Sequence, residues 1–232
     1  MRVTAMDEQG VQAGPRLKPD KVAYWYFRLN GFLQIENFVV HPGGRGGQRT
    51  DADLLGVRFP HRAEFLIDHP NDPMMDDEDS LSLRRNLIDV VIAEITRGPC
   101  KLNGPWTDPD KRNLHRVLAA LGCFRKEQID RAATALYRCG HHEEDGLRVR
   151  LIAIGRERAD DLGGSNKYAD VVQITWSQVL DFMWSRFDTY RHQKSQVDQW
   201  DMCGKKLKAL AGQERESSNF KAKAFALMGV NH

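Results

Sequence analysis

Two carboxylates stand inside otherwise apolar stretches of the chain. Asp53 lies within residues 52–59 and Glu94 within residues 88–95, and both stretches have the composition of strands. An ionised carboxylate in an apolar strand is costly unless it is paired or bound to a metal. If the strands are neighbours, Asp53 and Glu94 converge on one divalent cation, with water and the backbone carbonyl of Ile95 as further ligands. Hard oxygen ligands suit Mg²⁺ or Mn²⁺, which can activate a water and offset the charge that develops on a phosphodiester under attack.

The periodicity of apolar residues predicts the elements that must position these carboxylates. In chain order they are a helix at 20–29, strands at 37–41, 52–59 and 88–95, helices at 109–121 and 126–138, strands at 148–154 and 170–174, and a helix after 175. Asp20 and Asp108 are expected N-caps, and Thr175 with Gln178 forms a capping box. Looped connections between the early strands and helical ones between the later strands predict an α/β fold with a mixed central sheet flanked by helices.

This order, with an Asp on the second strand and a Glu-x-x stretch on the third, resembles the core of the PD-(D/E)xK, or restriction-endonuclease-like, nucleases. The stretches that carry the resemblance are 50–57 (Thr-Asp-Ala-Asp-Leu-Leu-Gly-Val) and 90–98 (Val-Val-Ile-Ala-Glu-Ile-Thr-Arg-Gly). The resemblance spans about residues 20–175. It implies a metal-dependent endodeoxyribonuclease, a hydrolase serving restriction, repair or antiphage defence, with Asp53 and Glu94 as metal-binding acids. Glu36 would match the extra acid that some members carry near the first helix.

The chain departs from the family pattern at Thr96, where the family places a lysine that positions the attacking water. Threonine carries no charge, and Lys101, just beyond the strand, is the residue expected to substitute. Asn103 and Trp106 lie beside the same expected site. Three interpretations therefore stay open: an active nuclease, a catalytically inactive nuclease fold that acts as a DNA-binding or scaffold subunit, and a structural domain in which the two acids pair with nearby basic residues.

Four arginines are expected to contact the phosphate backbone of DNA. Arg45 lies within a glycine-rich turn at 43–47 and Arg49 follows it, whereas Arg148 and Arg150 begin a basic stretch on the fourth predicted strand. The acidic run at 76–79 lacks the spacing of a calcium loop, and we expect it to belong to a long solvated loop. DNA is thus the predicted partner, with a homodimer or a larger protein complex as a further expectation.

Composition limits the remaining possibilities. The 232 residues (26.5 kDa) are 41% hydrophobic and 28% charged with a formal net charge of +2, which describes a globular chain without a general affinity for polyanions. We expect a leader at 1–19, one domain at 20–190 and a basic helical extension at 191–232. No apolar stretch approaches the roughly 20 residues that cross a bilayer, and the first 19 residues lack the apolar segment of a signal peptide. The four cysteines form no C-x-x-C pair, so a cytoplasmic location with reduced thiols is expected.

Overall fold

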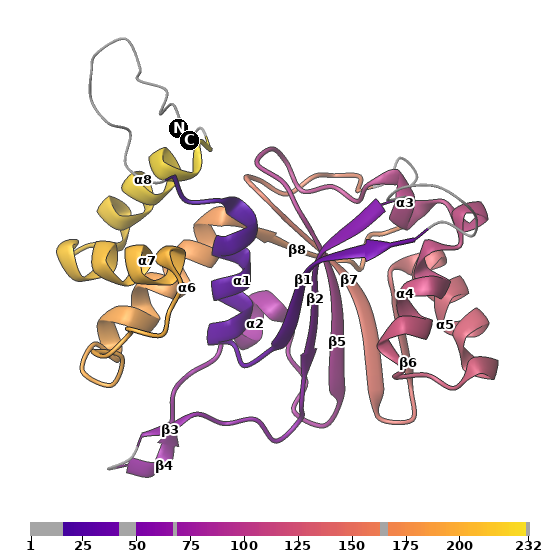
Figure 1. The fold of residues 1–232 in the computed structure, drawn as a ribbon, viewed down its shortest axis with the longest axis horizontal. Helices are drawn as coiled ribbons and strands as arrows, with labels where there is room; N and C mark the ends of the chain where they lie inside the picture. Colours follow the sequence, from indigo (N-terminus) through magenta and orange to yellow (C-terminus); the bar gives the residue numbers. More distant parts are fainter. Residues whose placement is uncertain (1–15, 42–49, 67–68, 163–166, 231–232) are drawn as a thin grey trace, which may run out of the picture.

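The computed structural model describes residues 16–41, 50–66, 69–162 and 167–230 and has a mixed central sheet with helices on both faces (Figure 1). The strands follow the order β1-β2-β5-β7-β6, and β8 pairs with the same edge of β7 as β6 does. Apolar side chains form one core on each face of the sheet. The predicted α/β class with a mixed sheet and flanking helices is therefore confirmed.

Three strands form an antiparallel meander at one side of the sheet: β1 (Leu33–Val40), β2 (Thr50–Arg58) and β5 (Ile88–Ile95). β2 and β5 lie at the positions predicted for them to within a few residues. β1 begins four residues earlier than predicted, because the segment 33–36 pairs with residues 54–57 of β2. β5 is buried along nearly its whole length, as its continuous apolar sequence predicts for a central strand.

The fourth long strand, β7 (Leu147–Gly155), runs parallel to β5. It is preceded by β6 (His141–Glu144), whose polar His-His-Glu-Glu sequence does not predict a strand. The two strands join through Asp145 and Gly146, both with positive φ (52° and 76°), as a tight hairpin turn of the Asp-Gly type requires. The short strand β8 (Val172–Thr175) pairs with the second half of β7.

One face of the sheet is covered by α1 (Pro19–Leu29), α6 (Trp176–Thr189), α7 (Met202–Gln213) and α8 (Ser217–Met228), as Figure 1 shows. Thr175 caps α6 through the predicted capping box. α1 starts at Pro19 with Lys18 at its N-cap, so Asp20 lies in the first turn instead of capping the helix. Residues of α7 and α8 share a single core with α1 and α6, so the boundary predicted at residue 190 marks no break in packing.

The other face carries the short α3 (Gly104–Thr107), a 3₁₀ turn (Pro109–Lys111), α4 (Asn113–Leu121) and α5 (Lys126–Cys139). Asp108 caps the 3₁₀ turn by accepting a hydrogen bond from the Asp110 amide (3.1 Å). The predicted helix from Pro109 is interrupted at Arg112, whose φ of 53° ends the 3₁₀ turn before α4 begins. The buried Asn113 side chain donates to the Pro105 carbonyl (3.1 Å) at this point.

The expectation of a solvated loop at 76–79 is wrong. This region contains β3 (Phe65–Leu66), β4 (His69–Pro73) and α2 (Glu78–Leu81). The Asp76 side chain is 7% exposed and lies 2.8 Å from Nη2 of Arg58 and 3.8 Å from Nη1 of Arg186. Asp77 accepts a hydrogen bond from the Tyr26 hydroxyl (2.7 Å). Asp76 and Asp77 therefore bind polar groups of buried residues instead of facing solvent, which composition alone does not reveal.

None of the helices in the described part of the chain is long and apolar enough to cross a membrane.

Candidate functional site

Asp53 and Glu94 meet at the end of the β2–β5 ladder. The last paired residues there are Leu54 and Ala93, so Asp53 and Glu94 occupy the next opposed position on two adjacent strands. The Ile95 amide then donates to Oδ2 of Asp53 (2.7 Å), so a side chain takes the hydrogen bond that a neighbouring backbone carbonyl would otherwise accept. The two carboxylates that the sequence singled out are thus brought together.

Glu94 is held in a mostly buried position, with 5% of the residue exposed. Its Oε1 accepts a hydrogen bond from Nδ2 of Asn103, and Trp106 also hydrogen-bonds the carboxylate. Its Oε2 is buried and has no hydrogen-bond partner. Burial raises the pKa of Glu94 to about 8, and the charge of Asp53 adds to this, while Trp106 and Lys101 act in the opposite direction. A buried carboxylate oxygen without a donor is a site that a cation would satisfy.

Asp53 lies in a local excess of negative charge. Burial raises the pKa of Asp53 to about 6 against the hydrogen bond from Ile95, and the charges of Asp20 and Asp51 raise it further. Asp20 and Asp51 were not among the predicted site residues. Period-two alternation shows that Asp51 lies on the same side of β2 as Asp53, but no sequence pattern places Asp20, which comes from α1 on another part of the chain.

Lys101 and Thr96 lie close to the carboxylates but differ in what they supply. Lys101 is exposed, and its charge lowers the pKa of Glu94, so it is within electrostatic reach of the site. Thr96 is held by its backbone: its amide donates to the Ile154 carbonyl (2.9 Å) and its carbonyl accepts from Nε1 of Trp176 (2.8 Å). Lys101 is therefore a positive charge near Glu94. Thr96 fixes the backbone just after β5 through its bonds to Ile154 and Trp176.

Glu36 pairs with Lys21 of α1, and the same lysine lies 3.9 Å from Asp201. One Glu36 oxygen, Oε1, is buried without a partner. Because Glu36 already has a cationic partner, the structure gives it no direct link to the Asp53–Glu94 pair.

Arg148 and Arg150 occupy buried positions on β7, with 7% and 3% of each residue exposed. Both guanidinium groups bind Asp89, with Nη2 to Oδ2 distances of 2.9 Å for Arg148 and 2.7 Å for Arg150. Both side chains are therefore paired inside the protein, and their predicted contact with a DNA backbone stays a prediction. The other two predicted DNA-binding residues, Arg45 and Arg49, lie outside the described residues.

The oxygen ligands of Asp53 and Glu94 suit a small hard cation that keeps several of its waters. They do not suit a cation that needs a full cage of protein side chains. Among the described residues, no group of three or more His, Cys, Asp and Glu side chains is arranged to hold a metal. The side chains offer two carboxylates, one with an unpartnered oxygen, and the Ile95 carbonyl stays a predicted ligand. Mg²⁺ binds in this way, through one or two carboxylates with several waters retained.

Comparison with protein-family models, curated proteins and solved structures gives no match to this chain.

Proposed function

We propose that this chain has a restriction-endonuclease-like core and hydrolyses phosphodiester bonds in DNA with the help of a divalent cation. The observation that carries the proposal is the opposed, largely buried pair of Asp53 and Glu94 at the end of the β2–β5 ladder, with one Glu94 oxygen lacking a partner. A structural domain would be expected to neutralise such a pair with arginine or lysine, as the chain does for Asp89. The order helix, three-stranded meander, helices, parallel strand also supports the proposal.

The residues of the chain have separable tasks in this function. Asp53, Glu94 and the Ile95 carbonyl would hold Mg²⁺ or Mn²⁺, which when bound supplies Lewis-acid stabilisation of the phosphate and a more acidic water. Asn103 and Trp106 orient the Glu94 carboxylate, and the Ile95 amide orients that of Asp53. Lys101 contributes positive charge toward the scissile phosphate in the role that a motif lysine would have.

The direct test is cleavage of supercoiled plasmid and of single-stranded DNA by the purified protein with Mg²⁺ or Mn²⁺. The isosteric variants Asp53→Asn and Glu94→Gln should lose cutting, because each removes one charged ligand. Glu127→Gln, an exposed acid on α5, is the matched control and should cut like the parent. Metal-dependent cutting that persists in both site variants would overturn the assignment of the active site.

A second function is favoured by one residue, Thr96. Without a lysine at this position the fold could bind DNA as an inactive subunit of a larger complex, including a homodimer, without cutting it. Salt-dependent DNA binding by a folded protein that cuts no substrate with either metal would support this second function over the first. In that case Asp53→Asn and Glu94→Gln should bind DNA as well as the parent does.

A further inference from the structure

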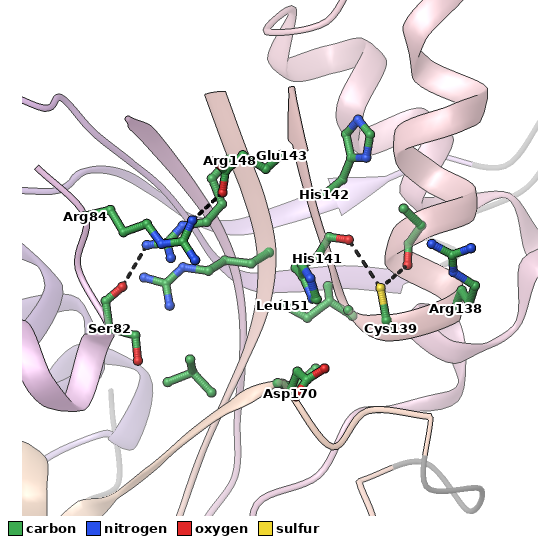
Figure 2. A pocket seen from close by; sticks show the side chains of 15 residues that line it. Ser82, Arg84, Arg138, Cys139, His141, His142, Glu143, Arg148, Leu151 and Asp170 are labelled. Atoms are coloured by element: carbon green, nitrogen blue, oxygen red, sulfur yellow. Dashed lines mark hydrogen bonds and ion pairs between the residues drawn. The ribbon is translucent and has the colours of Figure 1, made fainter. Parts of the chain in front are cut away.

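A separate cavity of about 530 Å³ opens where the edge of β7 changes partner. β6 pairs with β7 up to Arg150 and β8 pairs with it from Ile152, so a notch is left at Leu151 between the two edge strands. The end of α5, the segment after α2 and the residues just before β8 complete its walls. Figure 2 shows side chains from these separate segments around the cavity.

The charge of this cavity is predominantly positive. Arg84, Arg138, Arg148 and Arg150 line it, against the carboxylates of Glu143 and Asp170. Figure 2 shows that Arg84 and Arg148 lie close together on the same side as Ser82, and that Arg138 and His141 lie across from them. The Arg84 side chain is 56% exposed and pairs with Glu143.

The arginines at the back of the cavity are not fully neutralised. Arg148 and Arg150 share the single carboxylate of Asp89, so the buried cluster keeps one excess positive charge. Nη1 of Arg150 is buried and has no hydrogen-bond partner, and only 3% of the residue is exposed, so water does not replace the missing partner. A buried guanidinium group with an unused donor and an excess charge is stabilised by an anion, and phosphate matches the geometry of several arginines.

We propose that this cavity binds a phosphomonoester, with the phosphate held between Arg84 and the Arg148–Arg150 pair. The volume exceeds that of a phosphate ion and leaves room for the group that carries it. Arg150 pairs in register with Val91, three residues from Glu94 along β5, so the cavity lies about 10 Å along the strands from the candidate active site. The proposal does not depend on nuclease activity, because none of its residues belongs to the Asp53–Glu94 site.

The test measures binding of inorganic phosphate and of dAMP by calorimetry and by thermal shift, at an ionic strength fixed with NaCl. Deoxyadenosine, which lacks the phosphate, is the ligand control and should not bind. Arg84→Ala should weaken dAMP binding about tenfold or more, because it removes a charge-assisted contact. Arg85→Ala is the matched control, since Arg85 is the adjacent exposed arginine, pairs with Glu78 and does not line this cavity.

Arg150→Lys keeps the buried charge but removes the guanidinium fork, and it should weaken binding in a protein whose circular dichroism matches the parent. Oligonucleotides with a 5′-phosphate or a 5′-hydroxyl, compared with dAMP, distinguish the source of the phosphate. Binding of dAMP identifies a small phosphorylated ligand. Binding of the 5′-phosphorylated strand alone identifies a DNA end. Absence of saturable binding at millimolar dAMP, phosphate and 5′-phosphorylated strand would overturn the proposal, as would equal losses in Arg84→Ala and Arg85→Ala. Asp53→Asn should bind dAMP normally, which separates this outcome from failure of the nuclease proposal.

Discussion

Glu94 keeps a carboxylate in surroundings that oppose its charge, and this conflict is the most informative feature at the scale of single residues. Burial and the neighbouring Asp53 both disfavour the ionised form, and only Oε1 has a hydrogen-bond donor in the structure. Asp89 is equally buried but is surrounded by two arginines that lower its pKa against the effect of burial. The chain therefore neutralises Asp89 with its own arginines, whereas one oxygen of Glu94 is left without a hydrogen-bond donor.

The first prediction concerns stability without metal. Folding raises the pKa of Glu94 from 4.5 to about 8. The native state is therefore destabilised relative to the unfolded state as pH rises above 4.5, because the unfolded chain gives up this proton more readily. Glu94→Gln removes that cost and should raise the free energy of unfolding in EDTA at pH 8 by about 1 to 3 kcal/mol. The gain should vanish below pH 4.5, and thermal melts across this range would measure it. A melting temperature at pH 8 that falls on substitution would show that the Glu94 charge is stabilising, as in a purely structural role.

Lys101 supports a second prediction at the residue scale. If its charge acts on the phosphate, Lys101→Ala should reduce the cleavage rate by roughly 100-fold. DNA binding should change little, because one phosphate contact contributes little of the total affinity. Lys126→Ala, at the exposed start of α5, is the control. Equal rates in Lys101→Ala and the parent would exclude Lys101 as the substitute for the lysine absent at position 96.

At the scale of elements, the Asp89–Arg148–Arg150 cluster joins the two central strands β5 and β7, which run parallel to each other. Asp89→Asn leaves two buried guanidinium groups without their carboxylate and should cost about 3 to 5 kcal/mol. Because the arginines lower the pKa of Asp89, the stability that this pair provides is present above the unfolded pKa of about 3.9 and is lost as pH falls through the lower folded value. Urea denaturation at pH 7 and pH 3 would measure this, with exposed Asp110→Asn as the control. Equal unfolding free energies for Asp89→Asn and the parent at pH 7 would contradict it.

The elements also show which features the sequence could predict. Continuous apolar runs located β5 and β7, and capping signals located α6, because these features depend on local residues. The hairpin strand β6 and the small elements around Asp76 were missed, since polar strands and buried acids are stabilised by partners distant in sequence. In the site, Asp53 and Glu94 were found because an acid in an apolar strand is visible locally. Asp20 was missed as part of the site because only packing of α1 beside β2 brings it there.

At the scale of the whole molecule, the C-terminal helices complete the core. Leu207, Phe220, Phe225 and Met228 are buried in the same cluster as Trp25 of α1 and Trp176 of α6. A chain ending at residue 190 would expose the apolar surfaces of α1 and α6. We expect such a truncation to be insoluble or to lose cooperative unfolding, measured by circular dichroism and limited proteolysis. A truncated protein that melts cooperatively near the parent temperature would instead support the boundary predicted from sequence.

A pair of glycines in α7 tests the same dependence without removing any residue. A Cβ atom at Gly204 would lie 2.2 Å from the ring of Trp25, whereas one at Gly212 would meet nothing within 4 Å. Gly212→Ala should therefore stabilise the protein by up to about 1 kcal/mol through helix propensity. Gly204→Ala receives the same local benefit but must push α7 away from α1, and it should lower the unfolding free energy by about 1 to 3 kcal/mol. Chemical denaturation of the two variants would decide the matter. If both stabilise equally, α7 moves freely with respect to α1 and the helices beyond residue 190 are not part of the folding unit.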